Sequence, residues 1–143
     1  MRNRIVLTLF IAALACFTAF HFFPWSTGSD LAGWQIWRFV VRIPTDWEVQ
    51  NLLPTFGFLS SGLLLAASPF LVPVFEASRL ARNLILLGSA LAAISLTGFI
   101  AWLSIDQGKF SGASGMISMM FAQIFHVAGM VAIKRPPPPS LPG

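Results

Sequence analysis

The sequence has 143 residues, of which 56% are hydrophobic and 10% are charged, and its mean hydropathy is +0.77. Soluble proteins carry charged side chains at about 25% of positions, so this composition excludes a water-facing globular domain and indicates a chain surrounded by lipid. The net charge of +4 does not indicate a nucleic-acid partner, because the basic residues are scattered at the ends of apolar runs and form no patch.

The chain begins with an apolar run over residues 5–23 that follows two arginines, Arg2 and Arg4. A secretory signal also has a basic start, but its apolar core is only about 7–15 residues long, and no small-x-small cleavage site lies near Trp25. We therefore expect a retained transmembrane helix. Cys16 lies within this run and is the one cysteine of the sequence, so no internal disulfide can form.

Residues 24–53 form the longest segment between apolar runs and contain most of the tryptophans: Trp25, Trp34, Trp37 and Trp47. Indole rings prefer the headgroup layer, so we expect these side chains to anchor an extracytoplasmic loop at the membrane surface. A helix over about 31–42, capped by Ser29 or Asp30, is favoured within this loop. The β-branched run 39–43 leaves a strand open as the alternative.

Three further apolar runs are long enough to cross a bilayer, which requires about 20 helical residues each. We expect these spans at residues 54–75, 80–105 and 113–133. Pro69 and Pro73 each remove a backbone donor, and therefore predict a kink or an early end of the second span. A short charged hinge at 76–82 follows it. Residues 1–135 are thus predicted to form one all-α integral membrane domain, an up-down bundle of four transmembrane helices.

Four crossings place both termini on the same side of the membrane. That side carries six basic residues at span ends: Arg2, Arg4, Arg79, Arg82, Lys134 and Arg135. The opposite side carries three: Arg38, Arg42 and Lys109. The excess of Lys and Arg in cytoplasmic segments predicts a multi-pass protein of the plasma (inner) membrane with both termini in the cytoplasm. The proline-rich cytoplasmic tail, residues 136–143, is expected to form a polyproline helix.

Small residues recur at four-residue spacing in the third and fourth spans. Because lipid supplies no hydrophobic drive between helices, small side chains stabilise a bundle by letting backbones approach closely. We therefore predict helix-packing faces that include Ser89, Ala93, Thr97, Ala101, Ser118 and Ala122.

His126 lies deep in the fourth span, and Gln123 precedes it by one helical turn. Ionisable groups at this depth are rare and often functional, although a neutral histidine bonded to a neighbouring helix is also ordinary packing. If functional, His126, Gln123 and the methionines within residues 116–120 would line a pocket for an apolar ligand, pigment or haem. A bis-histidine haem with His21 is not expected within one chain, because His21 lies within about one turn of the outer face whereas His126 lies roughly 20 Å from it.

The order of span, long loop, span, tight turn, span, short loop and span resembles the layout of claudin-like tetraspans. Claudin-type loops carry a Gly-Leu-Trp motif with two cysteines, whereas Gly33-Trp34 here has no cysteine near it. The resemblance is therefore one of layout and assigns no family.

Catalytic patterns are absent from the sequence. No span has a charged residue near its middle, and no Ser–His–Asp, Ser–Lys or clustered Cys/His arrangement is visible, which argues against an enzyme and a protein-held metal. We expect a non-catalytic accessory or assembly subunit, without a cofactor, whose partners are lipid and the other subunits of a larger membrane complex. Two alternatives remain: an apolar ligand, pigment or haem-binding protein that uses His126, and an oligomeric transport or pore component.

Overall fold

The computed structural model describes residues 2–25, 32–42, 49–107 and 114–133. Its regular elements in these ranges are α1 (Arg2–Phe22), α2 (Gly33–Arg42), α3 (Val49–Ala77), α4 (Arg79–Gln107) and α5 (Ser114–Ala132). Four of these helices are long and apolar enough to cross a membrane, through windows at Arg4–Phe22, Thr55–Ala77, Arg79–Gly98 and Ser114–Ala132. The prediction of an all-helical chain with four such helices is therefore confirmed.

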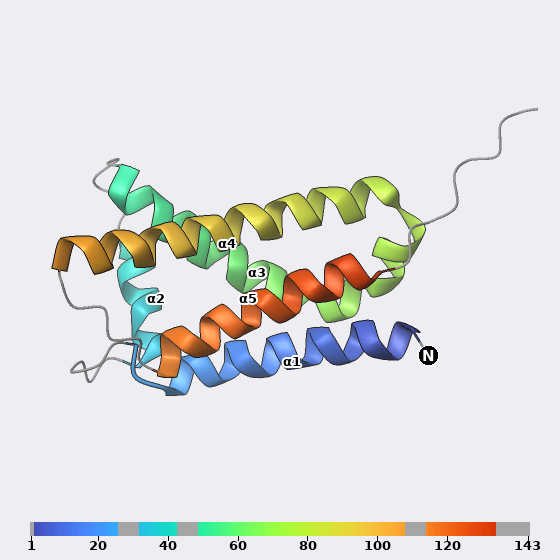
Figure 1. The fold of residues 1–143 in the computed structure, drawn as a ribbon, viewed down its shortest axis with the longest axis horizontal. Coiled ribbons are helices and arrows are strands. Elements are labelled where there is room, and N and C mark those ends of the chain that lie inside the picture. Colours follow the sequence, from blue (N-terminus) through green and yellow to red (C-terminus); the bar gives the residue numbers. More distant parts are fainter. Residues whose placement is uncertain (1, 26–31, 43–48, 108–113, 134–143) are drawn as a thin grey trace, which may run out of the picture.

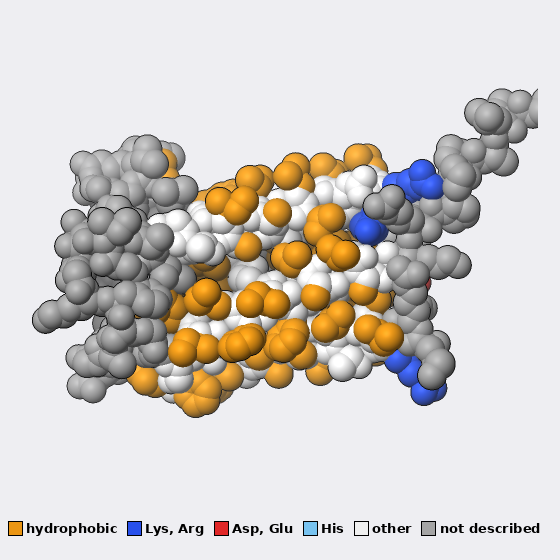
Figure 2. All heavy atoms as spheres, viewed as in Figure 1, with side chains coloured by type: hydrophobic (Ala, Val, Ile, Leu, Met, Phe, Trp, Pro, Cys, Tyr) orange, Lys and Arg blue, Asp and Glu red, His pale blue; other side chains and the backbone are white. Residues whose placement is uncertain are grey.

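The four long helices lie side by side, and each runs antiparallel to the next in the chain, while the short α2 crosses one end of the bundle (Figure 1). We call this the α2 end. The opposite end carries Arg4, Arg79 and Arg82, and the Lys and Arg side chains in view gather there (Figure 2). We call it the basic end.

The helices associate as two tight pairs. α1 packs most extensively against α5, and α3 against α4, whereas α4 and α5 touch far less. One buried cluster lies toward the α2 end and includes Phe20, Phe58 and Leu65; a second, toward the basic end, includes Phe10 and Phe75. Large apolar side chains also cover the outside of the bundle, as expected where lipid is the solvent (Figure 2).

Ser78 alone separates α3 from α4. Its hydroxyl accepts a hydrogen bond from the Ala81 N–H at 3.2 Å, which makes it the N-cap of α4. The expected hinge at 76–82 is therefore a single non-helical residue. α3 does not end at Pro69 or Pro73, because a helix within a bundle tolerates the loss of those two donors.

The segment after α1 forms a helix and not a strand, since α2 covers Gly33–Arg42. The predicted caps Ser29 and Asp30 lie outside the described residues. At the start of α2, the Gln35 side chain accepts a hydrogen bond from the Ala32 N–H at 2.8 Å, and the Gly33 N–H donates to the Phe23 carbonyl at 3.1 Å. The first bond caps the start of α2, and the second fastens α2 to the residue that follows α1.

Candidate functional site

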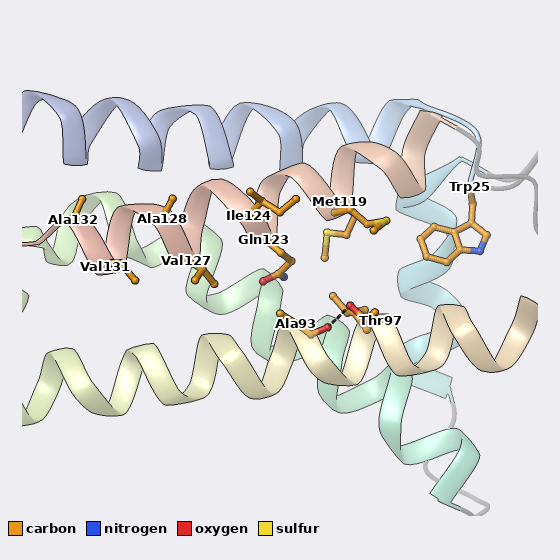
Figure 3. Close-up of a pocket in the computed structure, with 12 residues that line it drawn as sticks. Trp25, Ala93, Thr97, Met119, Gln123, Ile124, Val127, Ala128, Val131 and Ala132 are labelled. Carbon is orange, nitrogen blue, oxygen red and sulfur yellow. Dashed lines mark hydrogen bonds between the residues drawn. The ribbon is translucent and has the colours of Figure 1, made fainter.

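The thin contact between α4 and α5 leaves a groove of about 630 Å³. We call it the α4–α5 groove. It is lined by Trp25, Ala93, Leu96, Thr97, Met119, Met120, Gln123, Ile124, Val127, Ala128, Val131 and Ala132. Figure 3 shows Gln123, Val127 and Val131 pointing from α5 toward α4, with Trp25 at one end of the groove. The walls are almost entirely apolar. The lining side chains that can form hydrogen bonds are those of Gln123, Thr97 and Trp25.

The small-residue stripe on α4 accounts for part of this opening. Four residues turn an α-helix by about 40° more than one full turn, so a stripe with strict four-residue spacing rotates off the packing face. Ser89 is fully buried, Ala93 is half-buried and Thr97 is exposed, and the last two line the groove. The stripe therefore begins inside the bundle and ends at its surface. The side chain of Ala101 lies outside the described part of the chain.

The small residues of α5 behave differently. Ala122 is fully buried within the cluster toward the α2 end, and Ser118 is half-buried. At the start of the same helix, the Gly115 N–H donates to the Pro24 carbonyl at 3.0 Å. Close packing of α5 thus faces α1 and the loop that follows it, and not α4.

Gln123 is a buried polar group of the groove that lacks a partner among the described residues. Its side chain is only 7% exposed, and its Nε2 is buried without a hydrogen-bond partner in the described residues. The Thr97 hydroxyl, by contrast, donates to the Ala93 carbonyl of its own helix at 2.8 Å. Buried polar groups are nearly always hydrogen-bonded, so an amide left unpaired in an apolar groove requires an explanation.

An aromatic cluster closes the α2 end of the groove. The Trp25 ring lies 5.9 Å from that of Phe20 and 5.5 Å from that of Phe58, measured between centroids. Trp34 is instead exposed, with the Arg38 guanidinium 4.9 Å from its ring centroid. Of the predicted interface anchors, Trp25 therefore belongs to the buried cluster and Trp34 to the surface. Trp47 lies outside the described residues.

Trp37 joins α2 to α1 through His21. Its indole N–H donates to His21 Nε2 at 2.9 Å, and His21 Nδ1 lies 2.7 Å from the Phe17 carbonyl. Because an indole can only donate, Nε2 must be unprotonated, and the Nδ1–H donates to Phe17. His21 is thus a neutral bridge between the two helices, a pairing that the separate sequence positions did not indicate.

His126 does not line the groove. It is fully buried, and its Nε2 lies 2.5 Å from the hydroxyl of Ser68, which itself donates to the Leu64 carbonyl at 2.6 Å. Since the hydroxyl has one proton, His126 Nε2 carries a hydrogen and donates to Ser68. The Phe10 ring packs on the imidazole at a centroid distance of 5.6 Å. His126 therefore connects α5 to α3 and α1.

The structure separates the two residues that the sequence grouped together. Gln123 points toward α4, as Figure 3 shows, whereas His126 faces Ser68 on α3. Met119 and Met120 line the groove with Gln123, but Met116 does not. The groove therefore contains Gln123 and two of those methionines, but neither His126 nor Met116.

Replacing His126 by leucine is expected to leave the free energy of unfolding within about 1 kcal/mol of the wild type. Ser68 keeps its bond to Leu64, and the change removes an Nδ1 that has no hydrogen-bond partner among the described residues. Unfolding by denaturing detergent measures the difference, with Phe10→Ala as the control that opens a cavity at the same place. If the free energy of unfolding of His126→Leu fell by more than 3 kcal/mol, the imidazole would contribute more than packing to the fold.

Across the ranges that the structure describes, no three His, Cys, Asp or Glu side chains come together as a metal site would require. His21 and His126 are each bonded to a neighbouring helix. No family model, curated protein or solved structure matches this chain.

Proposed function

We propose that this protein is a non-catalytic membrane protein that binds an elongated apolar molecule in the α4–α5 groove. The observation that carries the proposal is the buried, unpartnered Nε2 of Gln123 in an otherwise apolar wall. Small-molecule sites have volumes of roughly 300–1,000 Å³ and combine apolar walls with a few placed polar groups. The groove, at about 630 Å³, has this size and composition.

The chemistry and length of the groove limit the class of ligand that can bind. The Gln123 amide offers N–H donors, so the ligand must bring an acceptor such as a carbonyl oxygen. From Met119 to Ala132 the groove follows α5 for roughly 20 Å at 1.5 Å per residue, which suits a chain-like molecule. A donor in hydrocarbon has no water to bond, and pairing it with a ligand carbonyl removes that cost. A lipid-soluble carbonyl compound with an acyl or isoprenoid chain meets both requirements.

Native mass spectrometry of the protein purified in mild detergent tests this proposal. The wild type should retain one such molecule, and Gln123→Leu should weaken its retention about tenfold through loss of one hydrogen bond in a dry site. The empty Gln123→Leu protein should also be at least as stable as the wild type, since a buried unpaired amide is gone.

The matched control is Thr97→Val in the same groove, because the Thr97 hydroxyl is already bonded within its helix. It should retain the ligand as the wild type does. Equal ligand loss in the two variants, or a wild type that carries no such molecule, would refute the proposal.

A second candidate is an accessory subunit of a larger membrane complex, in which a helix of another subunit fills the groove. The observation in its favour is the small-residue wall formed by Ala93, Thr97 and Ala128, since such residues permit close approach of helix backbones. A polar side chain of that helix would then accept the hydrogen bond from Gln123. The same purification distinguishes the two, because it would yield a stoichiometric protein subunit and no small molecule.

The gathering of Arg4, Arg79 and Arg82 supports a cytoplasmic location for the basic end, in the plasma (inner) membrane. This orientation places α2 and its tryptophans on the extracytoplasmic side. A reporter fused after Gly143 should then be active in the cytoplasm, and activity only outside the cell would reverse the assignment.

A further inference from the structure

A second groove lies at the basic end, beside the start of α4. It has a volume of about 420 Å³ and is lined by Arg79, Arg82, Asn83 and Leu86. Arg82 is only 8% exposed, and its Nε is buried without a hydrogen-bond partner among the residues described. Among the residues that the structure describes, this groove shares no lining residue with the α4–α5 groove.

The Arg82 guanidinium carries a positive charge into a largely buried position. A buried cation is normally paired, and leaving it unpaired is costly. In the described part of the chain no carboxylate pairs with Arg82, and the first turn of α4 contains no acidic residue. The N-terminus of a helix also carries a partial positive charge, which makes two arginines in this turn more unfavourable and an anion more favourable.

We propose that the groove beside Arg82 binds a phosphate group. The planar guanidinium presents parallel N–H donors that match phosphate oxygens in a bidentate manner. Arg79 adds a second guanidinium at the exposed rim, and the Asn83 amide adds further donors. Phosphate would thereby satisfy the buried Nε and neutralise the local charge.

Both a lipid headgroup and free phosphate could supply this group. The groove lies beside the first turn of α4, which is the end of a helix long enough to cross a membrane, and headgroups are expected at that depth. Leu86 connects its floor to the apolar cluster that contains Phe75 and Ile133. A phosphate site next to an apolar floor matches a phospholipid, in which the phosphate is attached next to the acyl chains. The experiment below compares a phospholipid with free phosphate.

Binding is measured by native mass spectrometry on the full-length protein with two lipids of the same acyl chains. Phosphatidylglycerol carries the phosphate, and galactosyl diacylglycerol lacks it. We expect preferential retention of phosphatidylglycerol and an affinity about tenfold lower in Arg82→Gln, as for the loss of a charged hydrogen bond. Arg4→Gln is the matched control, since it removes the same charge from an exposed position at the same end, and its affinity should stay within about twofold of the wild type.

Inorganic phosphate is the second arm, at constant ionic strength. Thermal stabilisation of the wild type by phosphate but not of Arg82→Gln, without a lipid preference, would assign the site to soluble phosphate. Equal retention of the two lipids together with no effect of phosphate would overturn the proposal, as would equal losses in Arg82→Gln and Arg4→Gln. Asn83→Asp, at an exposed position, replaces Arg82→Gln if that variant does not fold, and should weaken binding at least fivefold by placing a carboxylate at the rim.

Discussion

Replacing Gly33 by alanine is expected to lower the free energy of unfolding by about 3 kcal/mol, although it adds a single methyl group. A Cβ at this position would overlap the carbonyl oxygen of Phe20 and lie 2.8 Å from its carbonyl carbon. These are backbone atoms of α1 and cannot turn aside as a side chain would. α2 must therefore move away from α1, and the Trp37–His21 hydrogen bond is lost with it.

Gly98→Ala is the matched control, because a Cβ at Gly98 meets nothing within 4 Å. Alanine is favoured over glycine inside a helix, so this variant should gain about 0.5–1 kcal/mol. Unfolding in denaturing detergent measures both changes, and hydrogen exchange over residues 33–42 reports directly on the attachment of α2. Unchanged protection of that segment in Gly33→Ala would show that α2 is not held by this contact.

The four spans were predictable because bilayer thickness fixes the length of an apolar helix. The second span was expected at 54–75, and the apolar window of α3 is Thr55–Ala77. The helix itself begins earlier, at Val49, since hydrogen bonding within α3 does not stop where the hydrophobic run begins. The predicted run therefore agrees closely with the apolar window of α3, whereas the start of the helix was not predicted.

The side-chain pairs were not predictable in the same way. His126 is hydrogen-bonded to Ser68 of another helix, and Trp37 is hydrogen-bonded to His21, which precedes it in α1. Each pair depends on how one helix is rotated about its axis relative to another, and a single sequence contains no direct signal for that rotation. The sequence identified His126 and Gln123 as unusual polar residues, but grouped them in one pocket because they are one turn apart.

Arg82 shows a second limit of the sequence signal. At the sequence level it contributes to the positive charge that orients the chain, as Arg79 does. In the structure Arg79 is exposed and Arg82 is nine-tenths buried. The two residues are three positions apart on one helix, and only their packing against the rest of the bundle distinguishes the exposed charge from the proposed phosphate-binding group.

Replacing Ala128 by phenylalanine is expected to reduce retention of the apolar ligand at least tenfold while preserving the fold. Ala128 is half-buried on α5 and lines the α4–α5 groove, so an aromatic ring there occupies space that the ligand needs. Because the ring enters an existing groove and not a packed core, the free energy of unfolding should stay within about 1 kcal/mol of the wild type.

Ala66→Phe is the matched control for this change, since Ala66 is exposed on the outside of α3 and does not line the groove. Native mass spectrometry after identical purification compares the three proteins. If the groove is the ligand site, Ala128→Phe and Gln123→Leu should both retain less ligand than the wild type, and Ala66→Phe should retain as much. If Ala128→Phe retained the molecule as fully as the wild type, the molecule would have to bind elsewhere, and the unpaired amide of Gln123 would need another explanation.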